Sequence, residues 1–342
     1  MKTKITEKKE IDFFPFERKK IIDLLGKEKL LDALDKMLLI RNFELRAESA
    51  YLQGKIGGFF HSYVGQEAIQ TSLLAICGTD HWYAATYRCH ALALLLGATP
   101  NELMAELYGR ANGNAWGRGG SMHLYTDRLL GGFGIVGGQV PIAIGAAFSL
   151  KYQKQEDKIA ICFLGDGAVA QGAFHESLNL ASLWDLPCLF VIENNQWGMG
   201  TGIERAIAVE RLAEEKASGY RMNGYTFDGM DFFSCYAGFS HVYEEVRLTQ
   251  RPVLVEVCTQ RFRGHSISDP GLYRSKEELE KVIEQDSLIA LSNELEDLGM
   301  LTKDIYKDMD KRQRKLAIDA MKYADESPWP DLTSLEEGVY AP

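Results

Sequence analysis

Two polar segments of the chain contain residue types that bind a metal ion and a phosphate group in proteins. A Gly-Asp-Gly turn occupies residues 165–167 after an apolar run, and the pair Asn194-Asn195 follows a second apolar run. Asp166 offers a carboxylate and Asn195 an amide oxygen, which are ligands that Mg²⁺ and Ca²⁺ prefer. Each segment alone is equally compatible with a plain turn. Together they predict a site for a divalent cation and a phosphate.

Both segments are expected at the ends of buried strands. The apolar runs at 158–164 and 186–192 are typical of strands covered on both faces, and residues 168–183 between them have helical spacing. A strand, a helix and a strand in such a short stretch form a crossover that makes the strands parallel. We expect further strands at 81–87 and 252–259. The pattern predicts an α/β fold with a doubly wound, mainly parallel sheet.

Ligands of such sheets bind beyond the carboxyl ends of the strands. Tyr87 and Arg88 come at the end of one expected strand, and a loop from Arg261 to His265 follows another. Arg88 can donate a forked pair of hydrogen bonds to a phosphate. The helix expected from Ala168 would present free N–H groups at the same edge. Four strand ends therefore carry groups suited to one anionic ligand and its metal.

Composition excludes several classes of function. The 342 residues include 38 Lys or Arg and 48 Asp or Glu, and this net charge of −10 argues against binding nucleic acid through a broadly basic surface. No apolar run approaches the roughly 18 residues of a membrane span. The charged N-terminus resembles neither a signal peptide nor a transit peptide. Six scattered cysteines without a CxxC pair favour reduced thiols in a cytoplasmic protein.

Further motifs occur in a fixed order along the chain. The Gly-Asp-Gly turn and the Asn pair 26 residues later resemble the thiamine-diphosphate motif. From about residue 30 to 280 the chain resembles the alpha subunits of the pyruvate dehydrogenase component of 2-oxo acid dehydrogenase complexes. The stretches that carry this resemblance are 60–68 (FHSYVGQEA), 85–88 (ATYR), 118–123 (RGGSMH), 134–141 (GIVGGQVP) and 264–271 (GHSISDPG).

The resemblance implies thiamine diphosphate and Mg²⁺ as cofactors, held by a sheet of the thiamine-diphosphate-binding type. Asp166, Asn195 and the carbonyl of Trp197 would bind Mg²⁺. The diphosphate would contact the side chains of Tyr87 and Arg88 and the backbone N–H groups of Gly167 and Ala168.

Five more residues take roles from the same resemblance. The backbone of Gly134 and Val136 would contact the aminopyrimidine ring. His265 would lie over the diphosphate and the reacting centre. His61, and with it His123, would line the approach of the substrate. These three histidines are the expected catalytic residues, because histidine can transfer protons in the reaction that the resemblance implies.

The implied reaction is the oxidative decarboxylation of pyruvate, with transfer of the acetyl group to the lipoyl domain of a dihydrolipoyl acyltransferase. Thiamine diphosphate supplies the electron sink. In this family the glutamate that activates the cofactor belongs to a beta subunit, and two alpha and two beta chains assemble. No carboxylate of this chain is therefore given that role, and Glu193 is expected to orient its loop.

The expected organisation is one domain at 28–326, between a charged arm at 1–27 and a tail at 327–342 that contacts a neighbouring subunit. Apolar periodicity predicts three further helices, at 28–53, 275–298 and 302–324.

The chain departs from the mitochondrial pattern of the family in the loop after the last expected strand. Arg263 stands where those members have a second histidine, and it could neutralise charge near the phosphates. Ser266 matches a phosphorylated loop serine, but the next such site is missing. These differences argue against kinase control and indicate a bacterial, cytoplasmic type.

Alternatives remain at two levels. Within the family, the substrate could be a branched-chain 2-oxo acid or acetoin instead of pyruvate. Outside it, residues 132–137 fit the G-x-G-x-x-G fingerprint of NAD-dependent oxidoreductases, with Asp157 as the acid. That context fails, since residues 125–130 lack the pattern of a buried strand and Asp157 precedes a strand. A non-catalytic scaffold subunit is the third alternative.

Overall fold

The computed structural model describes residues 11–339 and contains a six-stranded sheet in the order β2-β1-β3-β4-β8-β7. Every neighbouring pair in this sheet is parallel. The predicted doubly wound α/β fold is therefore confirmed. The strands are β1 (Trp82–Thr86), β2 (Leu129–Phe133), β3 (Ala160–Gly165), β4 (Cys188–Asn194), β7 (Asn223–Asp228) and β8 (Val253–Cys258).

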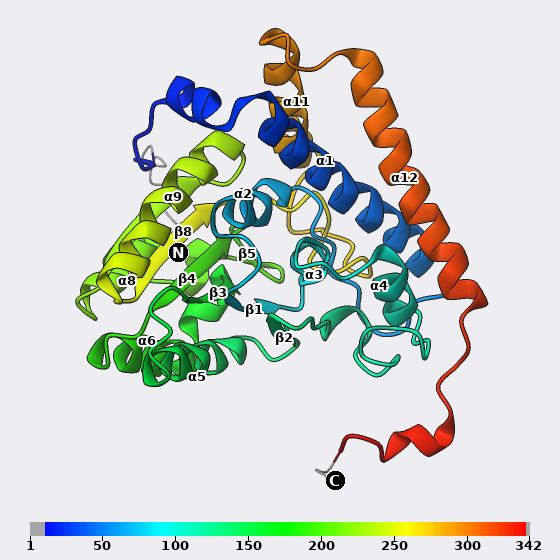
Figure 1. Ribbon diagram of the computed structural model, residues 1–342, viewed down its shortest axis with the longest axis horizontal. Helices are drawn as coiled ribbons and strands as arrows, with labels where there is room; N and C mark the ends of the chain where they lie inside the picture. Colours follow the sequence, from blue (N-terminus) through cyan, green and yellow to red (C-terminus); the bar gives the residue numbers. More distant parts are fainter. Residues whose placement is uncertain (1–10, 340–342) are drawn as a thin grey trace.

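Alternate residues of the strands point to opposite faces, and each face is covered by helices. On one face the core contains Cys162, Leu164 and Phe190, packed under the helices α5 (Gln139–Tyr152), α6 (Gly172–Leu183) and α8 (Leu212–Ser218). On the other face the core contains Ile161 and Val191 under α2 (Glu67–Cys77) and α9 (Phe232–Thr249). Figure 1 shows α5 and α6 together on one side of the sheet.

Two long helices form an outer layer beyond α2. Helix α1 (Arg18–Leu52) is interrupted at Gly26, whose φ of 64° is in the left-handed region that glycine adopts readily. Helix α12 (Lys303–Glu326) runs beside α1, and α11 (Ser287–Asp297) lies near the N-terminal half of α1 (Figure 1). In residues 11–339, no helix combines the length and apolar character that a membrane span requires.

The shorter elements complete the chain. They are α3 (His90–Leu95), α4 (Pro100–Leu107), α7 (Ile203–Ala206), α10 (Lys276–Ile283), the strands β5 (Trp197–Gly198) and β6 (Thr201–Gly202), and 3-10 turns at Gly120–Met122, Asp166–Ala170 and Leu332–Leu335. Beyond α12, the ring of Trp329 packs under Arg110 at 3.7 Å, and Arg118 donates a hydrogen bond to the carbonyl of Glu337. The six cysteines are free thiols, as expected.

Several predicted boundaries were wrong. The helix expected over 275–298 is two helices, because the Asp286 side chain accepts a hydrogen bond from the N–H of Leu288 and starts α11 there. The helix expected from Ala168 begins at Gly172, after a 3-10 turn. Residues 18–25, expected in the charged arm, are helical, since Ile22 and Leu25 are buried against the core.

Strands β2 and β7 were not predicted at all. Both are edge strands, and glycine or asparagine in each weakens the strand pattern. Strand β2 overlaps the start of the G-x-G-x-x-G segment, but only residues 129 and 130 of the range 125–130 belong to it, and the strand is only partly buried. Asp157 nevertheless precedes β3 and does not end a strand, which still argues against the NAD fingerprint.

Candidate active site

A cavity of about 940 Å³ lies at the carboxyl ends of the parallel strands. The chain reverses its direction across the sheet between β1 and β3, which is where ligands bind in open α/β sheets. Eleven of the twelve residues predicted for the site line this cavity. They are His61, Tyr87, Arg88, Gly134, Val136, Asp166, Gly167, Ala168, Asn195, Trp197 and His265.

His123 is the twelfth residue, and it does not line the cavity. Its side chain is exposed, and its Nδ1 lies 3.0 Å from the carbonyl oxygen of Gly119. The ring packs behind Gly134, where a Cβ atom would lie 3.2 Å from Nε2 of His123. His123 therefore supports the wall of the cavity in this structure.

The side chains of Asp166 and Asn195 present buried oxygens at the ends of two adjacent strands. Asp166 Oδ2 and Asn195 Oδ1 have no hydrogen-bond partner among the described residues, whereas Asn195 Nδ2 donates to Gln66 at 3.3 Å. Burial raises the pKa of Asp166 to about 6, although the charges of Arg261 and Arg88 act in the opposite direction. Both oxygens are available to a hard metal ion.

The turn that begins at Asp166 differs from the expected one. Gly167 and Ala168 belong to the 3-10 turn at Asp166–Ala170, so their N–H groups are not at an α-helix N-terminus. On the other side, Asn194 accepts a hydrogen bond from the N–H of Gln196 at 3.0 Å, and Gln196 has a φ of 71°. This local turn leads the chain to Trp197, whose ring lies 4.8 Å from that of Tyr273.

Two arginines give the cavity a positive charge. Arg88 and Arg261 are 5% and 2% exposed, and neither forms an ion pair within residues 11–339. Burial and the neighbouring Arg261 lower the pKa of Arg88 to about 10. Two buried, unpaired guanidinium groups are costly unless an anion joins them. Arg261 was not among the predicted site residues, although its place after β8 is the signal that could have identified it.

His61, Tyr87 and His265 form an aromatic cluster at one end of the cavity. The ring of His61 lies 4.3 Å from Tyr87 and 4.9 Å from His265, measured between centroids. Burial, together with Arg88, lowers the pKa of His61 to about 2 and that of His265 to about 4. Both rings are therefore neutral near pH 7.

The tautomer of His265 follows from its partner. Arg261 Nη1 lies 3.2 Å from His265 Nδ1, and a guanidinium can only donate. Nδ1 therefore accepts, and the proton of the neutral ring is on Nε2.

Glu193 also lines the cavity but is engaged by the protein. It accepts hydrogen bonds from the Tyr63 hydroxyl and, at 3.0 Å, from Gln70 Nε2. Burial raises its pKa to about 7. These contacts fit the expected orienting role.

Arg263, by contrast, is not near the groups predicted to bind the phosphates. It binds both carboxylate oxygens of Glu48 on α1, at 3.0 and 2.9 Å, and it does not line the cavity. The expectation that it neutralises charge near the phosphates was wrong, because its loop directs the side chain toward α1.

Comparisons with known proteins agree with the fold. A sequence profile described as "Dehydrogenase E1 component" matches residues 35–333. The chain is 42% identical over 316 residues to the pyruvate dehydrogenase E1 component subunit alpha of Rickettsia prowazekii, covering 92% of this chain and 96% of the relative. It is 39% identical over 313 residues to the corresponding protein of Rhizobium meliloti, covering 91% and 89%.

A mitochondrial relative has a longer chain. The pyruvate dehydrogenase E1 component subunit alpha of Kluyveromyces lactis is 38% identical over 320 residues, covering 92% of this chain and 77% of its own. Both the profile and these relatives extend over most of the sequence, including all six strands of the sheet. The chain belongs to the dehydrogenase E1 component family.

Proposed function

We propose that this chain is the alpha subunit of a pyruvate dehydrogenase E1 component that depends on thiamine diphosphate and Mg²⁺. The observation that carries the proposal is a set of four groups in the cavity, two side-chain oxygens without a hydrogen-bond partner and two arginines without an ion pair. Two orphaned oxygens, on Asp166 and Asn195, face the same space as two unpaired cations, on Arg88 and Arg261. A divalent cation joined to a diphosphate satisfies all four groups at once.

The donor set also suits this metal. Within residues 11–339 no group of three or more His, Cys, Asp or Glu side chains is arranged to bind a metal. Mg²⁺ commonly binds through one or two carboxylates together with substrate phosphates, and it does not require such a group. Asp166, Asn195 and the carbonyl of Trp197 would hold Mg²⁺, while the N–H groups of Gly167 and Ala168 would bind the diphosphate.

The remaining residues define the reaction space. Thiamine diphosphate, when bound, supplies the electron sink for decarboxylation of a 2-oxo acid. Neutral His61 and His265 can hold or move a proton, and the Nε2–H of His265 is a donor. Gly134 and Val136 also line the cavity, and their backbone would contact the aminopyrimidine ring. Tyr87 packs against both histidines and fixes their separation.

The partners follow from the same proposal. A beta subunit completes the site, in an assembly of two alpha and two beta chains, and the lipoyl domain of a dihydrolipoyl acyltransferase accepts the acetyl group. The glycine-containing helix α5 and the tail at 327–342 are the surfaces proposed to contact neighbouring chains; residues 340–342 of the tail lie outside the described residues. We also propose a single domain, which includes residues 18–27 because α1 begins at Arg18, and a cytoplasmic location.

The cofactor is tested on the chain assembled with its beta subunit. Thiamine diphosphate with Mg²⁺ should raise the melting temperature, whereas NAD should not. Asp166→Ala should abolish this shift while size-exclusion chromatography shows an intact assembly. An unchanged shift in the variant, or no shift in the wild-type complex, would refute the cofactor assignment.

The substrate needs a separate test. In steady-state assays of the same complex, decarboxylation of pyruvate should be faster than decarboxylation of 3-methyl-2-oxobutanoate and faster than cleavage of acetoin, which has no carboxylate to lose. A preference for the branched acid would assign the chain to a different member of its family. The described residues favour neither of these alternatives.

A further inference from the structure

Two loops that carry the cavity histidines are joined to one another. We call residues 60–66 and 260–269 the loop pair. The N–H of Ile267 donates to the carbonyl of Phe60 at 3.0 Å, and the N–H of Phe262 donates to that of Val64 at 3.3 Å. At Gly65, φ is 100° and a Cβ atom would lie 2.7 Å from the carbonyl oxygen of Gln260. The two loops are therefore in contact along their backbones.

Arg88 joins the loop pair from the cavity side. Its guanidinium donates to the carbonyl of Ser62 at 2.7 Å and to that of His265 at 2.6 Å. One buried group thus links the residue after His61 with His265 itself. A shift of either loop would change the separation of the two histidine rings, which is 4.9 Å.

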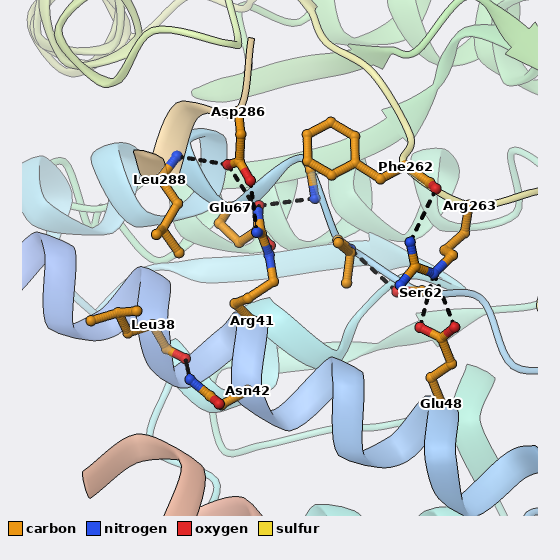
Figure 2. Close-up of polar contacts among 12 residues, drawn as sticks. Leu38, Arg41, Asn42, Glu48, Ser62, Glu67, Phe262, Arg263, Asp286 and Leu288 are labelled. Atoms are coloured by element: carbon orange, nitrogen blue, oxygen red, sulfur yellow. Dashed lines mark hydrogen bonds and ion pairs between the residues drawn. The ribbon is translucent and has the colours of Figure 1, made fainter. Parts of the chain in front are cut away.

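Helix α1 holds the same loops from outside, as Figure 2 shows. Arg41 forms a forked ion pair with Glu67 and binds Asp286 at 2.8 and 3.0 Å. Glu67 in turn accepts a hydrogen bond from the N–H of Gly65 at 3.0 Å. The guanidinium of Arg41 also lies 5.6 Å from the ring centre of Phe262. Arg41 therefore contacts one loop directly and the other through one carboxylate.

A second ion pair lies seven residues further along α1. Glu48 binds Arg263 through both oxygens, and Arg263 also donates to the carbonyl of Phe262 at 3.3 Å. Seven residues are about two helical turns, so Arg41 and Glu48 are on the same face of α1. Figure 2 shows the two contacts side by side above this helix.

We propose that Arg41 and Glu48 are positioning residues, through which α1 holds the loop pair as one unit and sets the geometry of His61 and His265. The proposal rests on the proposed function for the role of the two histidines. The coupling of the loops is independent of it, because the contacts involve only this chain. Neither residue lines the cavity.

Hydrogen–deuterium exchange tests the coupling in the cofactor-free complex with the beta subunit. Glu48→Met removes the contact with Arg263 alone and leaves Arg41 unchanged. We expect amide protection to fall about tenfold in both 60–66 and 260–269, the loss expected for one charge-assisted pair. A fall confined to 260–269, or no fall in either loop, would overturn the proposal.

Asp35→Leu is the matched control, since Asp35 also lies on α1 and pairs with Arg312 at 2.6 Å and Gln313 at 2.8 Å of α12. It should loosen the contact of α1 with α12 and leave the loop pair protected. An equal loss of protection in the loop pair would show that α1 acts only as general support, which also overturns the proposal.

Kinetics then separate positioning from folding. In Arg41→Lys, which keeps the charge but not the fork, we expect kcat to fall about tenfold with a small change in KM for the 2-oxo acid. An unchanged kcat would contradict a positioning role. If the complex fails to bind thiamine diphosphate at all, the proposed function fails, while the exchange experiment still decides whether the loops are coupled.

Discussion

Four arginines belong to the loop pair or contact it, and their side chains have opposite surroundings on its outer side and on its cavity side. On the outer side, Arg41 and Arg263 are each matched by carboxylates, on Glu67, Asp286 and Glu48. On the cavity side, Arg88 and Arg261 are buried without an ion pair in the described part of the chain. Burial lowers the pKa of Arg41 as well, but Glu67 and Asp286 outweigh it and raise that pKa above its usual value.

The comparison distinguishes arginines whose charge is balanced within the chain from arginines that we propose bind an anion. A matched buried ion pair is satisfied within the chain, so removing its cation strands the carboxylates. An unmatched buried cation gains its partner only when an anion binds. Substitutions on the two sides should therefore affect stability and binding in opposite proportions.

The largest effect is expected outside the cavity. Arg41→Met leaves Glu67 and Asp286 buried and unpaired, which should lower the free energy of unfolding by about 3–5 kcal/mol. Chemical denaturation of the assembled complex measures it. Adding Glu67→Gln and Asp286→Asn should recover part of the loss. A loss below about 1 kcal/mol would mean that the outer charges are not better matched than the inner ones.

Inside the cavity, a substitution should affect ligand binding more than stability. Arg261→Met should weaken thiamine diphosphate binding about 100-fold, or about 2.7 kcal/mol, since a charge-assisted contact to phosphate is lost. The unfolding free energy of the cofactor-free complex should change far less than in Arg41→Met. Titration calorimetry gives the affinity. Unchanged affinity with a large loss of stability would place Arg261 among the structural arginines.

The next effect in size is a loss of stability at low pH caused by the cavity histidines. Since the pKa of His61 is lowered to about 2 and that of His265 to about 4, below pH 6.5 the unfolded chain binds protons that the folded chain does not. The contribution of the two neutral histidines to the free energy of unfolding is fully present above the unfolded pKa of about 6.5. Below that pH, the contribution falls by roughly 1.4 kcal/mol per pH unit for each histidine. Denaturation at pH 7.0 and 5.5 should show a shallower loss in His61→Gln. An identical slope in the two proteins would argue that His61 is protonated when folded.

The smallest effect is expected where solvent screens the pair. Lys315 and Asp319 form an exposed ion pair on α12. Lys315→Met should change the free energy of unfolding by less than about 0.5 kcal/mol, measured in the same way. A change as large as that of Arg41→Met would show that burial does not explain the contrast between the arginines.

Much of the sheet could be predicted because its central strands are uninterrupted apolar runs. Strands β3 and β4 are buried along nearly their whole length, and this is the pattern that a covered parallel strand leaves in a sequence. The edge strands β2 and β7 contain residues that weaken the pattern, and their pairing is decided by the neighbour instead.

The cavity residues were predicted from strand ends and motif order, but the pairing of charges was not. Arg41 lies in a long polar helix, where a cation is ordinarily solvent-exposed, and its partners Glu67 and Asp286 are distant in the sequence. Arg261 and Arg263 are two residues apart and have opposite surroundings. Only the folded chain shows which of them is matched.

The strand order also affects how the chain is made. Strand β8 lies between β4 and β7, both of which leave the ribosome first. Until β8 is synthesised, β7 has no partner in the sheet and β4, buried over all seven residues in the finished protein, presents an open edge. Open apolar edges pair with other chains. A nascent chain that stops before residue 253 is therefore exposed to aggregation, and completing β8 closes the edge and delivers Arg261 and His265 to the cavity.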